Sequence, residues 1–108
     1  MANAVIQLTR ARGPYRDSLR SYLVWLDGGL VGKISRGKTL AFSVVPGVHG
    51  LQLTIDWASS RPYAFRLADD QTAEFYCKPA GAFYEVWRGL FAANEYIELV
   101  PLSPITPA

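Results

Sequence analysis

The stretch from Tyr22 to Trp57 constrains the fold more than any other part of the chain, because short apolar runs alternate there with residues that reverse a chain. Asp27-Gly28-Gly29 supplies the positive φ angles of a tight hairpin turn. Pro46-Gly47 fits a type II turn, in which proline presets the first central φ angle and glycine accepts a positive angle at the second. The stretch therefore predicts an antiparallel meander of short strands.

Alternation within the apolar runs predicts which side chains enter a core. Residues 49–57 show the cleanest period of two, and we expect one face of this strand to be buried. Residues 22–26 are apolar almost throughout, which is typical of a strand buried on both faces. Residues 3–10 predict a short strand at a sheet edge. The side chains predicted to point inward are His49, Leu51, Leu53, Ile55 and Trp57, then Leu40, Phe42 and Val44, then Tyr63, Phe65 and Leu67, then Ala73, Phe75 and Cys77, and finally Ile97 and Leu99.

The chain has 108 residues, half of them hydrophobic, which is enough for one domain with a single core. The apolar runs predict about seven or eight short strands, so the expected fold is all-β, an antiparallel β-sandwich of immunoglobulin-like type. We expect a single sandwich domain over residues 1–100. Residues 101–108 carry a proline at every third position and predict an extended, proline-rich C-terminal tail.

Residues 81–93 are the ambiguous segment, because their apolar residues fall at the spacing of an amphipathic helix. We expect a helical turn or short helix there, and a strand followed by a loop remains open. The predicted core is complete without Tyr84, Trp87 and Phe91, so these three aromatic residues are candidate partner-binding residues. The alternative is that the segment folds back and caps the sandwich.

The turn residues resemble those of the PEGA domain, a small β-sandwich module of bacterial proteins. The resemblance rests on VWLDGGLVGKI and SVVPGVHGLQL and covers about residues 22–78. The matching residues are Asp27, Gly28, Gly32, Pro46, Gly47 and His49. The stretch WASSRPYAF and the segments 1–20 and 79–108 depart from the family pattern. The chain is also similar to small actinobacterial proteins of this kind. The resemblance implies a non-catalytic surface or interaction module, with no catalytic residue to carry over.

Basic residues concentrate near the start of the chain. Residues 1–38 carry seven Lys and Arg against two Asp, a net charge of +5, and the remainder carries −3. A basic patch for an anionic partner is therefore a second hypothesis, alongside a purely solvated arm. The net charge of the whole chain, +2, is too small to indicate a dedicated nucleic-acid-binding protein. The candidate patch residues are Arg10, Arg12, Arg16 and Arg20.

Catalytic chemistry has little support in the sequence. A Cys/His hydrolase could use only Cys77 and His49, and both lie on predicted apolar faces, where burial makes a thiol inert. Structural zinc needs about four Cys or His ligands, so we expect no metal and no cofactor. Without a signal peptide or a membrane-spanning run, the chain is predicted to be cytoplasmic. The leading expectation is a non-enzymatic module that binds a protein partner or itself.

Overall fold

The computed structural model describes residues 3–12, 20–56, 58–79, 97–103 and 105–107. The described residues form ten strands and no helix, which confirms the all-β class. The predicted helix near residues 81–93 lies outside them. The strands are β1 (Ala4–Arg10), β2 (Tyr22–Leu26), β3 (Gly29–Ile34), β4 (Thr39–Val44), β5 (Gly47–Ile55), β6 (Ala58–Ser59), β7 (Tyr63–Leu67), β8 (Thr72–Pro79), β9 (Ile97–Pro101) and β10 (Thr106–Pro107).

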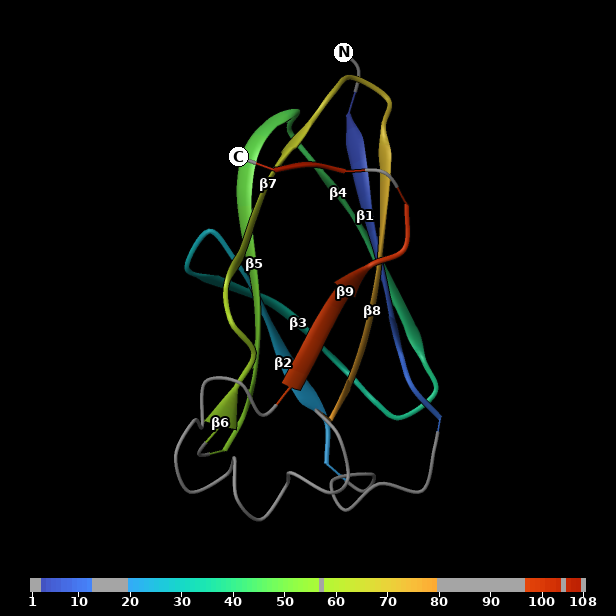
Figure 1. Cartoon of the computed structure of the whole chain (residues 1–108), viewed down its shortest axis with the longest axis vertical. Coiled ribbons are helices and arrows are strands. Elements are labelled where there is room, and N and C mark those ends of the chain that lie inside the picture. The colour runs from blue at the N-terminus through green and yellow to red at the C-terminus, as the bar shows by residue number, and fades with distance from the viewer. Residues whose placement is uncertain (1–2, 13–19, 57, 80–96, 104, 108) are drawn as a thin grey trace.

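The strands form two sheets that face each other as a sandwich (Figure 1). One sheet has the order β4-β1-β8-β9, and the other has the order β10-β7-β5-β2-β3, with β6 paired to β5. Strand β1 therefore lies between two neighbours, and the prediction that it forms an edge is wrong. It also runs parallel to β8, with Leu8 opposite Phe75, so the sandwich is not antiparallel throughout. An interior position suits β1 because Ala4, Ile6 and Leu8 are completely buried.

The meander predicted for residues 22–57 is only partly right. Strands β2 and β3 form the expected hairpin, but β4 crosses to the other sheet and pairs with β1. Strand β5 then returns and pairs with β2. Alternation shows which face of a strand is buried, but it does not show which sheet the strand joins. A strand with one apolar face can bury that face equally well in either sheet.

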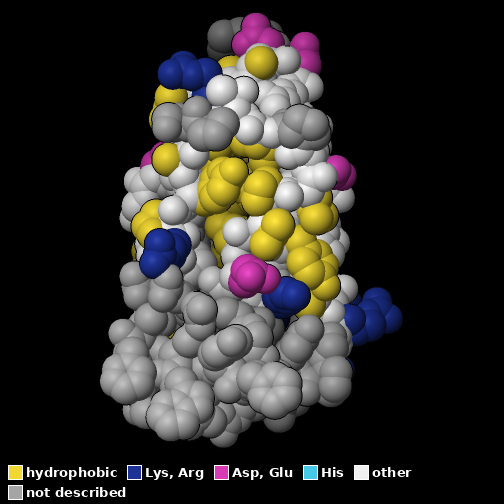
Figure 2. Space-filling model, viewed as in Figure 1, with side chains coloured by type: hydrophobic (Ala, Val, Ile, Leu, Met, Phe, Trp, Pro, Cys, Tyr) yellow, Lys and Arg dark blue, Asp and Glu magenta, His cyan; other side chains and the backbone are white. Residues whose placement is uncertain are grey.

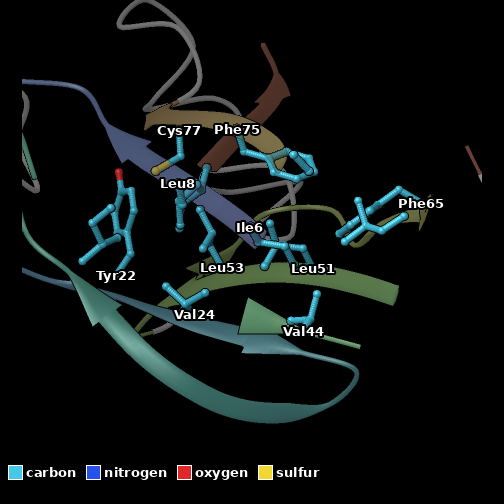
Figure 3. Close-up of a cluster of buried hydrophobic side chains, with 14 of the residues drawn as sticks. Ile6, Leu8, Tyr22, Val24, Val44, Leu51, Leu53, Phe65, Phe75 and Cys77 are labelled. Carbon is cyan, nitrogen blue, oxygen red and sulfur yellow. The ribbon is translucent and has the colours of Figure 1, made fainter. Parts of the chain in front are cut away.

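The core lies between the two sheets, and its side chains come from both layers (Figure 3). The predicted inward faces of β4, β5, β7, β8 and β9 are confirmed, because their inward residues in the described part of the chain are buried or partly buried against the core. Strand β2 differs from the prediction. Its Leu23 is 36% exposed, so β2 is buried on one face only.

The C-terminal residues connect the two sheets rather than forming a separate tail. The Leu102 N–H donates to the Glu74 carbonyl at 2.7 Å, and Thr106 in β10 pairs with Arg66 in β7. The segment runs across one open side of the sandwich, and hydrophobic side chains gather in the middle of that face (Figures 1 and 2). Proline spacing correctly suggested extended backbone, but Ile105 packs against the core and holds the segment in place.

Candidate functional site

An apolar surface covers the outer face of the β2–β3 hairpin. Val24 pairs with Gly32 but Trp25 pairs with Leu30, so Val31 is the extra residue of a β-bulge. The bulge places Leu30 and Val31 on the same outer face, where they are 54% and 43% exposed. We call this the β2–β3 surface, and it consists of Leu23, Trp25, Leu30 and Val31.

Strand β3 ends its sheet, and β2 is its only neighbour in the described sheet order. An exposed strand edge invites pairing with another chain, but a bulge twists the edge and discourages such pairing. The side chains of the outer face therefore offer a better contact than the backbone of β3. Exposed apolar side chains grouped in this way are typical of an interaction site.

A groove of about 330 Å³ opens on the same sheet, on the β5 side of Trp25. Because β5 lies between β2 and β7, Trp25 from β2 and Pro62, which immediately precedes β7, stand on either side of the groove. The Trp25 indole is fixed, since its Nε1–H donates to Thr54 Oγ1 at 2.9 Å. Gly50 leaves the floor open, because a Cβ atom there would meet no other atom within 4 Å. The volume lies within the usual range of ligand sites. The remaining lining residues are Asp27, Gly28 and Gln52.

Asp27 and His49 join the β2–β3 turn to β5 at one end of this groove. Asp27 has a φ angle of 52° and accepts the Gly50 N–H at 2.7 Å. The Nδ1 atom of His49 lies 2.7 Å from Asp27 Oδ2, and its Nε2 lies 2.6 Å from the Val45 carbonyl oxygen. Both partners are acceptors, so both ring nitrogens donate only when the imidazole is protonated.

These contacts shift both pKa values in the direction that favours a charged pair. Partial burial opposes the charge on His49, but the Val45 carbonyl and the Asp27 carboxylate outweigh it and raise the pKa of His49. Burial likewise opposes ionisation of Asp27, but the hydrogen bonds from His49 and Gly50 outweigh it and lower the pKa of Asp27. The Val45 contact also ties the ring to the backbone beside Pro46 and Gly47.

The pair should make stability depend on pH. The folded protein binds the His49 proton more tightly than the unfolded chain, so the stabilisation is complete below the ordinary histidine pKa of about 6.5 and is lost as the pH rises through the folded pKa. Asp27 acts in the opposite sense. Its stabilisation of the fold is complete above the ordinary aspartate pKa of 3.8 and is lost as the pH falls through the lowered pKa of the folded protein. We expect urea denaturation to give a higher free energy of unfolding at pH 5.5 than at pH 8.5.

The control for this prediction is His49→Gln, because His49 is the only histidine in the sequence. The variant should lose about 1–2 kcal/mol at pH 5.5, because hydrogen bonds to a charged group are worth about 1.5–3 kcal/mol each when shielded from water, and the Asp27 side chain is half exposed. Its stability should then be nearly the same at pH 5.5 and pH 8.5. If the free energy of unfolding fell equally between pH 5.5 and pH 8.5 in the wild-type protein and in His49→Gln, a group other than His49 would cause the pH dependence.

The four arginines predicted as a basic patch do not form one surface. Arg10 is only 2% exposed, its guanidinium carbon lies 3.8 Å from the centre of the Tyr22 ring, and its Nη1 donates to two backbone carbonyl oxygens. Arg10 is buried because residue 10 continues the inward alternation of β1. Arg12 is exposed, and the exposed Arg20 pairs with Asp56 at 2.6 Å. Arg16 lies outside the described residues.

The arrangement does not favour Cys/His chemistry. Cys77 is completely buried in the core, and both ring nitrogens of His49 already bond to Asp27 and Val45. His49 therefore has no ring nitrogen left to act as a base toward a thiol. Among the described residues, no three His, Cys, Asp or Glu side chains are grouped so that they could hold a metal ion.

Several other predicted residues cannot be placed. Tyr84, Trp87 and Phe91, the candidate partner-binding aromatics, lie outside the described residues, as does Trp57. Among the described aromatic residues, Phe65 is fully buried, Tyr63 packs against the core, and Trp25 stands on the outer face. No helix in the described part of the chain is long and apolar enough to cross a membrane.

Comparison with known protein-family models and with curated proteins found no match to this chain. The site therefore has to be interpreted from its geometry. Sequence reasoning missed Leu30, Val31 and Gly50 as surface features. Two features of the sequence indicate them. Leu30 and Val31 are adjacent apolar residues in a hairpin strand that is one residue longer than its partner, and Gly50 occupies one of the alternate positions of β5 that point outward.

Proposed function

We propose that this protein is a non-catalytic interaction module that binds a second copy of itself through the β2–β3 surface. The observation that carries the proposal is the bulge at Val31, which turns two neighbouring apolar side chains to the outer face of an edge strand. Leu30 lies opposite Trp25, and Leu23 lies two residues before Trp25 on the same face of β2, so the surface extends across two strands, with Lys33 opposite Leu23 at its border. Full burial of such a side chain gives roughly 1.5–3 kcal/mol, and Leu30 and Val31, at 54% and 43% exposed, would gain about half of that.

A second copy suits this surface because a two-fold dimer brings the same patch from both chains together, and an apolar patch is complementary to itself. The PEGA resemblance supports the same class of function, since its residues shape turns rather than reactive groups. The predicted aromatics Tyr84, Trp87 and Phe91 remain a further candidate surface. Binding of nucleic acid gains no specific support, because Arg10 is buried and Arg20 is paired with Asp56.

The change Leu30→Glu tests the proposal, because it places a charge in the centre of the apolar surface. Sedimentation velocity at increasing protein concentration should show that the wild-type protein self-associates. The variant should dissociate at least about ten-fold more readily, since burying one unpaired charge costs well over 1.4 kcal/mol.

Leu102→Glu is the matched control, because Leu102 is 58% exposed and follows β9 of the other sheet. It introduces the same charge at a similarly exposed leucine and should leave the association unchanged. A wild-type protein that stays monomeric throughout the concentration series would contradict the proposal. Equal weakening by both variants would also contradict it, because the effect would then come from charge alone.

A further inference from the structure

We infer that the groove beside Trp25 binds a neutral carbohydrate. This inference goes beyond self-association: Trp25 belongs to both sites, but the groove lies on its β5 side, whereas Leu30 and Val31 lie on its β3 side. A sugar ring combines an apolar face of C–H groups with a rim of hydroxyl groups. A site for it needs an exposed aromatic or apolar wall together with a few fixed polar atoms.

The walls of the groove meet the first requirement. Trp25 is partly exposed, and its hydrogen bond to Thr54 holds the indole in one orientation on the sheet. Pro62 supplies an exposed apolar wall on the other side of β5. Gly50 contributes no side chain to the floor, so a flat ring can approach the backbone closely. A fixed aromatic wall loses little conformational entropy when a ligand binds.

The polar atoms meet the second requirement. Gln52 donates through Nε2 to the Ser60 carbonyl at 3.1 Å, which leaves its Oε1 atom as an acceptor. Thr54 Oγ1 accepts from Trp25, which leaves its own O–H as a donor. Each Asp27 oxygen accepts one hydrogen bond within the protein and has a further lone pair. Hydroxyl groups both donate and accept, so they match this mixture.

The charge of the groove favours a neutral ligand over a cationic one. Among the residues that the structure describes, Asp27 is the only charged one that lines it. The Asp27 carboxylate bonds to His49, which carries a positive charge when both of its ring nitrogens donate. The two charges compensate each other at this end of the groove. A lysine or arginine side chain would therefore gain little attraction here.

The floor also disfavours a peptide bound through its backbone. The Gly50 N–H donates to Asp27 Oδ1 at 2.7 Å, and the Gly50 carbonyl accepts the Asp27 N–H at 2.8 Å. The backbone of the floor thus has its hydrogen bonds already. Trp25 cannot donate its N–H to a peptide carbonyl, since that hydrogen bonds to Thr54. Ligand hydroxyls would instead have to reach the side chains above the floor.

Isothermal titration calorimetry with cellohexaose, laminarihexaose and mannohexaose tests the inference, with a proline-rich octapeptide as the competing probe. At least one oligosaccharide should bind the wild-type protein. Gly50→Leu should weaken it about ten-fold or more by filling the groove, because Gly50 does not have a left-handed φ angle and its Cβ position is open. Trp25→Ala should weaken it to a similar extent by removing the wall.

Ala41→Leu is the matched control, because it enlarges an exposed residue on β4 of the other sheet and should leave the affinity unchanged. Thermal unfolding of each variant shows whether it is folded, and Trp25→Ala decides the question if Gly50→Leu does not fold. The inference is overturned if none of the oligosaccharides binds, if Gly50→Leu and Trp25→Ala bind as tightly as the wild-type protein, or if only the peptide binds. Gly50 lies outside the β2–β3 surface and Leu30 lies outside the groove, so sugar binding by Gly50→Leu and association of Leu30→Glu distinguish failure of the groove from failure of self-association.

Discussion

Replacing Phe75 by alanine should lower the free energy of unfolding by about 4 kcal/mol, the middle of the range for a buried phenylalanine. Phe75 in β8 is completely buried and meets Phe65 of the other sheet, with ring centres 5.1 Å apart. It also meets Tyr63 edge to face at 5.6 Å. The side chain therefore connects the two layers, and alanine would leave a cavity between them.

Urea denaturation measures this effect, and Glu74→Ala provides the control on the exposed face of the same strand. The control should stay within about 0.5 kcal/mol of the wild-type protein. Phe75→Leu should give an intermediate loss, because it keeps part of the volume. A loss below about 1 kcal/mol for Phe75→Ala would contradict the sandwich packing, since removing a phenylalanine from a packed core costs about 3–5 kcal/mol.

Replacing Arg10 by alanine should cost about 3 kcal/mol, a large effect for a residue that the sequence suggested as part of a surface patch. The guanidinium stacks on Tyr22 and donates to the carbonyl oxygens of Arg20 at 2.5 Å and Ile34 at 3.1 Å. Alanine would remove the stacking and leave these carbonyls without that donor. Hydrogen bonds to charged groups contribute about 1.5–3 kcal/mol each.

Arg10→Lys separates shape from charge, because an ammonium group keeps the charge but lacks the planar fork of a guanidinium. We expect it to recover only part of the lost stability in the same denaturation experiment. Arg12→Ala is the control at an exposed arginine and should be nearly neutral. If Arg10→Ala were as harmless as Arg12→Ala, Arg10 would be a surface residue after all.

Much of the fold could be predicted because turns and strand alternation are local properties. Asp27, Gly28 and Gly47 have positive φ angles at the predicted turns. The inward faces of most strands also follow directly from the period of two. The turn residues on which the PEGA resemblance rests, Asp27 and His49, are hydrogen-bonded to each other although 22 residues separate them in sequence.

The remaining features depend on contacts between distant segments. Nothing within residues 39–44 indicates that β4 leaves the sheet of its neighbours β3 and β5. The bulge at Val31 arises from pairing with β2, and the groove forms only where β2, β5 and the start of β7 come together. The predicted basic patch is wrong at Arg10 because arginine is usually a surface residue, whereas alternation along β1 places residue 10 inward.

An intermolecular distance at the β2–β3 surface tests the central claim most directly. A spin label can be attached at Lys33→Cys, because Lys33 is exposed opposite Leu23 and the native Cys77 is fully buried. Double electron–electron resonance should then detect a short distance between labels on two copies. The same label at Leu102→Cys should give a longer distance or none. No intermolecular signal at position 33, or a shorter distance at position 102, would contradict self-association through this surface.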